Sequence, residues 1–449
     1  MTNSLAKPDK KLLVGEFFSV LFPTSLAMIT HSFYCLADVF FVGKGVGSLG
    51  TAALNIALPI FTLFTAIGLL IGVGASTTIS VLQGQGRLDK IPTVFTIAVA
   101  VNLFFGVLLS VFGGIFCTKF AIFLGADQEL LPYVYDYLFP VLVTCFIYIM
   151  SAMLQVLIRS DGAPRLVMLS TITGNIANIG LDYLFVIVMD MGMLGASLAT
   201  AAGPMVALSM MMIHFRKGNV ARRLHLSLPS LKPSELPLLS RILRNGLGSL
   251  VLEISSGIVI FLFNIALLKT SGKGAVAVFT VISNVGYAGK MLFTGIAQSA
   301  QPIISRSFGN KSPEGIKLGF NLSFITACSF SALVYILLLL FPSQTLSLFI
   351  TDNPEIITQN LGAVSLYFSS FVFTAANTML MYYFQSLEKP KLTLAIAVLR
   401  GIVLVTLFLT ILPIFWGENG IWLSLTAAEV VSFIIFMPIS RKIKLNFEA

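Results

Sequence analysis

Residues 175–186 read NIANIGLDYLFV and lie inside a long run of apolar residues. On a helix, Asn178 and Asp182 would lie on one face, one turn apart, with Asn175 on the same stripe. A carboxylate in a lipid-embedded helix costs about 2.5 kcal/mol or more, so it persists where it faces protein or water and has partners. An acid inside a membrane span is therefore a candidate functional site.

The composition around this stretch is that of a membrane protein. The chain is 57% hydrophobic and only 10% charged. No charged residue lies between Lys44 and Arg87, or between Lys317 and Asp352, and about 20 apolar residues suffice for a helix to cross a bilayer. Cysteine and histidine are scattered without metal-type spacing. We therefore predict an all-α membrane protein that holds no cofactor and binds no nucleic acid.

Twelve transmembrane helices are predicted from the apolar runs and the turn signals between them. Their approximate bounds are 14–42, 52–82, 92–116, 133–158, 165–189, 193–214, 239–268, 275–305, 317–341, 357–386, 392–414 and 419–439. Lysine and arginine gather at the N-terminus and after even-numbered spans, and the opposite side carries only Lys44, Lys119, Lys269 and Lys273. The positive-inside rule then places both termini in the cytoplasm of a multi-pass cell (inner) membrane protein.

The chain reads as two halves of six spans each. Residues 215–238 are polar and basic and form a predicted cytoplasmic linker, with a lipid-headgroup site as the minor interpretation. They separate an N-lobe (1–214) from a C-lobe (239–449). QGQGRLDKI at 83–91 matches FGNKSPEGI at 308–316, and other motifs repeat at nearly the same offset. An even number of spans per half predicts lobes related by a parallel pseudo-two-fold axis, with alternating access by rocking.

Few acids lie within the predicted spans: Asp38, Asp182, Glu253 and Glu429. In the first span, His31, Tyr34 and Asp38 fall on one helical stripe. Two carboxylates that approach each other in a low dielectric cannot both ionise cheaply, so Asp38 and Asp182 together favour uptake of a proton. They favour Na⁺ if oxygen ligands such as those of Asn178 and Thr200 are near. The alternative is that these polar groups only hold helices together.

The second half has no counterparts of these aspartates at the repeat offset. Glu253 could pair with Lys290, and Arg400 with Glu429, as structural ion pairs. The functional alternative is that an exposed Glu253 attracts cationic substrates. Methionines such as Met150 and Met153 suit promiscuous binding of flat apolar cations, although for any single methionine ordinary lipid or core packing is the favoured interpretation.

Several motifs resemble those of multidrug and toxic compound extrusion (MATE) transporters. They are LADVFFVG at 36–43 with Pro23 and Tyr34 before it, NIANIGLDYLFV, GVGASTTISVLQGQGRLDK at 72–90, MGMLGASLATAAG at 191–203 and QSAQPIISRSFGN at 298–310. The resemblance covers essentially the whole chain. It implies two six-helix lobes around a cleft and export of cationic drugs in exchange for protons or sodium.

The resemblance also assigns residues. It implies an N-lobe cation site, which would ligate Na⁺ if coupling uses sodium, at Asp38, Asn178, Asp182 and Thr200. Together with the polar stripes and methionine clusters described above, it predicts that the substrate path is lined by Tyr34, His31, Asn175, Glu253, Met150 and Met153. Glu253 resembles the span-7 acid of members that use the C-lobe, but Arg400 in span 11 and the lack of an acid in span 10 argue against a cation site there.

The sequence thus predicts a secondary active antiporter without catalytic residues, working as a monomer in the lipid bilayer on small amphipathic, mostly cationic molecules. The first alternative is a flippase for a lipid-linked sugar, whose pyrophosphate would need a cationic wall that Lys290 and Arg400 alone hardly provide. The second is an intramembrane hydrolase that uses Asp38 and Asp182 as an acid pair. No protease-like glycine–acid motif accompanies them.

Overall fold

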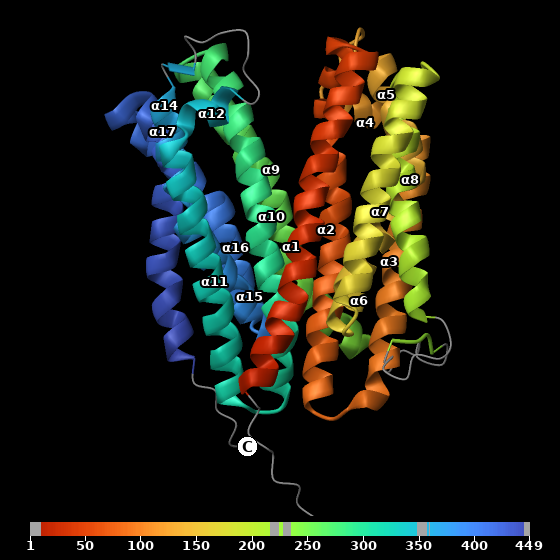
Figure 1. Cartoon of the computed structure of the whole chain (residues 1–449), viewed down its shortest axis with the longest axis vertical. Coiled ribbons are helices and arrows are strands. Elements are labelled where there is room, and N and C mark those ends of the chain that lie inside the picture. Colours follow the sequence, from red (N-terminus) through yellow and green to blue (C-terminus); the bar gives the residue numbers. More distant parts are fainter. Residues whose placement is uncertain (1–9, 216–223, 228–234, 348–356, 359, 444–449) are drawn as a thin grey trace, which may run out of the picture. The chain divides into compact units, whose positions relative to one another are not determined.

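A computed structural model describes residues 10–215, 224–227, 235–347, 357–358 and 360–443 (Figure 1). All regular secondary structure in these segments is helical, which confirms the all-α prediction. The first half contains α1 (Lys10–Gly45), α2 (Ser48–Gly84), η1 (Leu88–Lys90), α3 (Ile91–Ile115), α4 (Cys117–Phe123), α5 (Leu131–Val143), α6 (Cys145–Ser160), α7 (Pro164–Asp182), η2 (Tyr183–Val188), α8 (Gly192–Met211) and η3 (Met212–Phe215). The second half contains α9 (Leu236–Thr270), α10 (Lys273–Gly309), α11 (Pro313–Leu340), α12 (Pro342–Ser347), α14 (Leu361–Phe368), α15 (Phe371–Ser386), α16 (Pro390–Val398), η6 (Leu399–Val403) and α17 (Leu404–Lys442).

The helices of the described segments account for the predicted number of spans. Ten are long and apolar enough to cross a membrane, and the pair α5 and α6, bent by 56°, forms an eleventh. The run Pro390–Lys442 counts as one of the ten, although it is 53 residues long. It is interrupted at Gly417, whose backbone is not helical (φ 54°, ψ −133°) and which divides the run into two crossings. The protein is therefore a multi-pass membrane protein.

The helix boundaries repeat between the two halves. Helices α2 and α10 are both 37 residues long, and each ends on the glycine of its matching motif. Helices α6 and α15 are both 16 residues long, and α7 and α16 each begin at the matching proline. Gly192, the first residue of α8, and Gly417 within α17 both have positive φ angles, of 58° and 54°. The internal repeat inferred from the motifs is thus a repeat of structure.

By packing, the chain forms two compact units whose boundaries fall inside helices. The first unit is Ser19–Leu250, and the second comprises the residues up to Phe18 together with those from Val251 onward. The start of α1 thus belongs with the second half, and the start of α9 with the first half. The lobe boundaries at 214 and 239 stay a prediction, and most of the predicted linker lies outside the described residues.

Close helix contacts explain why the start of α9 belongs to the first unit. A Cβ atom on Gly246 of α9 would lie 1.7 Å from the carbonyl oxygen of Leu70 on α2. The amide of Asn245 donates a hydrogen bond to the Thr78 hydroxyl, 3.2 Å away. In the second unit, an ion pair between Glu16 and Arg306 ties the start of α1 to α10.

The interior of each unit is apolar and rich in aromatic side chains. In the first unit, one buried cluster surrounds Phe64 and Tyr137, and another surrounds Ile79 and Met153. The largest fully buried side chain of the second unit is Trp422. Large apolar side chains are also exposed along the described helices, including Phe22, Phe104, Phe123, Ile115, Ile414 and Phe415. Such extensive apolar exposure suits helices that face lipid.

Candidate functional site

The two aspartates of the first unit lie together in its interior. Asp38 is on α1 and is 8% exposed, and Asp182 is the last residue of α7 and is fully buried. Their carboxylates are close enough to interact electrostatically. The structure therefore brings together two acids that are far apart in the sequence, as the sequence analysis expected.

Three further polar side chains complete the group, and we call these five residues the acidic site. Asn178 lies one turn before Asp182 on α7 and is buried. Thr200 on α8 and Tyr137 on α5 have hydroxyl oxygens 3.5 Å apart, and Tyr137 also interacts electrostatically with Asp38. Tyr137 was not predicted, because its neighbours Tyr133 and Tyr135 give the same local pattern and only the rotation of the helix distinguishes them.

Most polar atoms of the acidic site have no hydrogen-bond partner within the described chain. Both carboxylate oxygens of Asp182, both amide atoms of Asn178 and Oδ1 of Asp38 are buried and unpartnered. A buried charge without a partner is very costly, and a proton, a bound cation or an ordered water would each relieve that cost. The oxygens of two carboxylates, an amide and a hydroxyl are ligands that a hard cation accepts. In the described segments, no three His, Cys, Asp or Glu side chains are placed so that they could hold a metal ion together.

The backbone geometry around Asp182 is unusual in two ways. A π-helical segment, η2, begins directly after it, and such segments are frequent at functional sites. Helices α7 and α8 also approach closely at Gly174 and Gly203, where a Cβ on Gly174 would lie 2.6 Å from the Gly203 carbonyl oxygen. A Cβ on Gly203 would lie 3.3 Å from Cβ of Asn178. This contact holds Asn178 against the helix that carries Thr200.

We expect Gly174→Ala to separate α7 from α8 and to disturb the acidic site. The added methyl group meets backbone, which cannot rotate away, so a loss of about 1–3 kcal/mol in the free energy of unfolding is expected. The matched control is Gly180→Ala on the same helix, where nothing lies within 4 Å of the new Cβ. Thermal unfolding of both purified variants measures the effect. Equal melting temperatures would mean that the helix contact is not needed.

The predicted path residues of the first unit have different environments. Tyr34 is half-buried, interacts electrostatically with Asp38, and packs on His31 with ring centroids 5.2 Å apart. Asn175 is buried, and its Nδ2 has no partner among the described residues. Met150 is partly buried, but Met153 is fully buried in the core cluster around Ile79, so its packing does not support a path-lining role.

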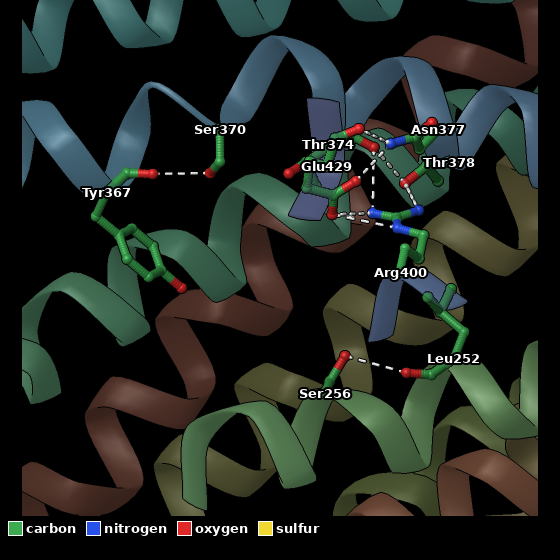
Figure 2. A network of polar contacts seen from close by, with 9 residues as sticks. All are labelled: Leu252, Ser256, Tyr367, Ser370, Thr374, Asn377, Thr378, Arg400 and Glu429. Carbon is green, nitrogen blue, oxygen red and sulfur yellow. Dashed lines mark hydrogen bonds and ion pairs between the residues drawn. The ribbon is translucent and has the colours of Figure 1, made fainter. Parts of the chain in front are cut away.

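The second unit contains a buried ion pair (Figure 2). Nη2 of Arg400 donates to Oε1 of Glu429 at 2.7 Å, which confirms the predicted pair. Arg400 also donates to the Thr378 hydroxyl at 3.2 Å and to the Thr374 carbonyl at 3.4 Å. The Asn377 amide donates to the other carboxylate oxygen of Glu429 at 2.7 Å. Thr374, Asn377 and Thr378 were not predicted, although their spacing places them on one face of a helix.

The second predicted pair is wrong as a direct contact. Glu253 on α9 and Lys290 on α10 interact electrostatically, but no ion pair joins them in the described part of the chain. Both side chains line one cavity together with Arg400 and Glu429. The structure therefore places Glu253 at a cavity wall and does not neutralise it by direct contact.

Comparison with known proteins identifies the fold and the family. The family model described as MatE matches residues 23–184 and 248–411. A multidrug export protein MepA from Staphylococcus haemolyticus is 23% identical over 98% of both chains. A multidrug export protein MepA from Staphylococcus aureus strain MRSA252 is 23% identical over 93% of this chain and 91% of its own length.

Solved structures of similar fold cover nearly the whole chain. An outward-facing multidrug resistance MATE transporter of the MOP superfamily superimposes with a TM-score of 0.88 and 22% identity, over 95% of this chain and 94% of that chain. A MOP superfamily transporter from Pyrococcus furiosus, described as having a binding pocket of reversed polarity, gives a TM-score of 0.89 at 23% identity over 98% of both chains. Both of these proteins are described as transporters. The family match across both halves, with these structures, shows that the chain belongs to the MatE family of membrane transporters.

Proposed function

We propose that this MatE-family efflux transporter is a secondary active antiporter that exports amphipathic, mostly cationic compounds in exchange for H⁺ or Na⁺. It works by alternating access, as a monomer in the cell membrane, with both termini in the cytoplasm. The observation that carries the proposal is the acidic site, where the carboxylate oxygens of Asp182 are buried and have no partner within the described chain.

The acidic site would couple transport to an ion because it is stable only when occupied. Asp38 and Asp182 bring two negative charges, and no described lysine or arginine forms an ion pair with either. A proton or Na⁺ removes this repulsion and lets α1, α7 and α8 pack together. Release of the ion restores the charge and favours a hydrated, open arrangement. An inward ion gradient would therefore alternate the protein between two packings and drive export.

The expected substrate class follows from charge and from the relatives. The relatives are multidrug export proteins, and a net negative site favours cations. Tyr34 lies next to Asp38 and offers an aromatic face, which attracts organic cations. Small hydrophobic cations would be attracted both by the negative charge of the acidic site and by the aromatic ring of Tyr34.

The flippase alternative is less well supported by the charges of the second unit. A lipid-linked pyrophosphate needs several available cationic groups. The guanidinium of Arg400 is already bound by Glu429 and by hydroxyl and carbonyl oxygens. Lys290 would then be the principal cation facing the cavity, with Glu253 in the same cavity wall. This arrangement favours the antiporter.

Dye transport in proteoliposomes tests the proposal. We expect the purified protein to move a fluorescent organic cation when an H⁺ gradient or a Na⁺ gradient is imposed, and to respond strongly to only one of them. The gradient that drives transport identifies the coupling ion. Transport of a lipid-linked sugar without response to either gradient would replace the antiporter with the flippase.

A further inference from the structure

The start of α9 is built into the first unit along one face of the helix. Ile242 is 1% exposed and belongs to the buried apolar cluster that contains Ile79. Asn245 and Ser249 are 4% and 1% exposed, and Gly246 is also buried. The spacing of three and four residues places these positions on one face of α9. We call Ile242, Asn245, Gly246 and Ser249 the α9 anchor.

The α9 anchor meets the backbone of α2 directly, because a glycine stands on each side of the contact. A Cβ on Gly74 of α2 would lie 2.0 Å from the carbonyl oxygen of Ile242. Gly246 meets α2 in the same way at the carbonyl oxygen of Leu70. Small residues let two membrane helices approach this closely. A contact of backbone on backbone has no flexible side chain that could absorb a shift, so the two helices are held in one register.

A buried polar contact and the chain segment before α9 reinforce the anchor. The amide of Asn245 donates to the Thr78 hydroxyl of α2 at 3.2 Å. In the segment before α9, Leu224 is 2% exposed and lies in the same apolar cluster as the anchor. The backbone amide of Ser227 donates to the Thr96 hydroxyl of α3 at 2.8 Å. Detachment would expose the apolar groups and break these hydrogen bonds, so it would be costly.

The same helix continues into the second unit and is held closely there too. The boundary between the units falls after Leu250, inside the continuous helix α9. In the second unit, a Cβ on Gly401 of η6 would lie 2.5 Å from Cβ of Ser255. Ser255 follows Gly246 by about two and a half turns of helix. Glu253, in the cavity wall of the second unit, lies between these two contacts. A movement of the first unit would therefore pass along α9 to this wall.

The equivalent helix of the first half is attached less firmly. Phe17 of α1 stands 225 residues before Ile242, at the offset of the internal repeat, and is also fully buried. Its neighbour Glu16 pairs with Arg306 of α10, but these side chains are 36% and 33% exposed. Exposed ion pairs contribute about 0–1 kcal/mol. The attachment of α9, which is built on backbone contacts and buried groups, is therefore the firmer of the two.

We propose that the α9 anchor stays closed throughout the transport cycle and transmits movement of the first unit to the cavity of the second. Thr78, Asn245 and Gly246 are then positioning residues for ion-coupled export, which act through α9. The inference rests on the proposed antiport. It adds the element by which ion binding at the acidic site of one unit changes the cavity wall of the other.

A disulfide across the contact tests whether it stays closed. Thr78→Cys with Asn245→Cys replaces the hydrogen-bonded pair by two thiols in the full-length protein, and oxidation joins them. Transport of a fluorescent organic cation in proteoliposomes is compared before and after oxidation, and each single cysteine variant is the control for the native cysteines. We expect the oxidised double variant to transport within about twofold of its reduced rate. Loss of transport on oxidation, restored by a reductant, would show that the contact opens during the cycle and would overturn the inference.

A substitution that loosens the contact gives the complementary result. Gly246→Ala should reduce gradient-driven dye transport by at least about tenfold. Dye binding by the same variant in lipid nanodiscs should stay within about threefold of wild type. Gly257→Ala on the same helix is the control, because nothing lies within 4 Å of its new Cβ. If Gly246→Ala does not fold, Thr78→Val takes its place, since it keeps the volume and removes the hydroxyl.

Rescue by the disulfide separates coupling from structural damage. Oxidation of Gly246→Ala that also carries the two cysteines should restore transport, which would not happen if the substitution merely damaged the fold. Full transport by Gly246→Ala, or no recovery once the disulfide has formed, would contradict the anchor.

Failure of the antiporter proposal would be distinguishable from failure of this inference. Dye transport that responds to neither H⁺ nor Na⁺ would defeat the antiporter, but oxidised and reduced protein can still be compared on that transport. If no dye moves at all, backbone hydrogen exchange of residues 242–249 decides. Slow exchange with and without Na⁺ and at acid and neutral pH would support a permanent anchor, and fast exchange in any of these conditions would overturn it.

Discussion

Asp182→Asn is expected to remove ion-driven export while leaving a folded protein in the membrane. The amide keeps the shape of the carboxyl group but cannot take up a proton or carry the charge that attracts Na⁺. Coupling free energies between sites are typically about 1–3 kcal/mol, or about 5- to 150-fold, and we expect a loss of gradient-driven dye transport in this range. Because the wild-type carboxylate is buried without partners, the melting temperature should stay the same or rise.

Asp190→Asn provides the matched control for this prediction. Asp190 lies shortly after Asp182 in the chain, but its side chain is exposed and its backbone has a positive φ of 52°, which asparagine tolerates. This variant should transport at the wild-type rate. Normal ion-driven transport by Asp182→Asn would show that coupling occurs elsewhere. Loss of transport together with a lower melting temperature would indicate a structural role.

The number and order of the helices could be predicted because the bilayer makes hydrophobic length a strong signal. The sequence predicted one span at 133–158, and the structure has α5 and α6, bent by 56° around Thr144, just after Pro140. A proline within an apolar run predicts a disturbance but does not give its angle. The sequence did not predict that the start of α1 belongs to the second unit and the start of α9 to the first unit. This assignment depends on helix contacts such as that of Gly246 with Leu70.

Site residues could be predicted where a charge stood out in an apolar run. Asp38 and Asp182 were found this way, and so were Arg400 and Glu429. Neutral partners were harder to find, since Tyr137 differs from its neighbours only by the direction in which the helix presents it. Pairing was predicted correctly for Arg400 and incorrectly for Glu253, because span membership does not determine depth or rotation.

The two repeated halves differ in how the structure compensates their buried charges. The fifth span of each half contains a π-helical segment next to polar residues, η2 after Asp182 and η6 around Arg400. In the first half, the acid there has no cationic partner within the described chain. In the second half, Arg400 supplies a permanent cation to Glu429. The guanidinium of Arg400 thus neutralises Glu429 in the second half, as a bound ion would neutralise the acids of the first half.

Arg400→Met should strongly destabilise the second unit. The methionine fills similar volume but leaves the Glu429 carboxylate buried, with the Asn377 amide as its remaining hydrogen-bond donor among the described residues. Breaking a buried ion pair by removing one partner costs about 3–5 kcal/mol. Thermal unfolding of the purified protein in detergent, read as a lower melting temperature, measures this loss.

The double variant Arg400→Met with Glu429→Gln tests whether the uncompensated charge of Glu429 causes the loss of stability. If the loss comes from an uncompensated charge, removing the carboxylate should recover much of the stability, because buried pairs replaced on both sides are often nearly neutral. Arg306→Met is the control, since its ion pair with Glu16 is 33% and 36% exposed and such pairs contribute about 0–1 kcal/mol. Equal stability of Arg400→Met and Arg306→Met would contradict the argument. A double variant as unstable as Arg400→Met would instead place the energy in packing, because the charge of Glu429 would then have no measurable cost.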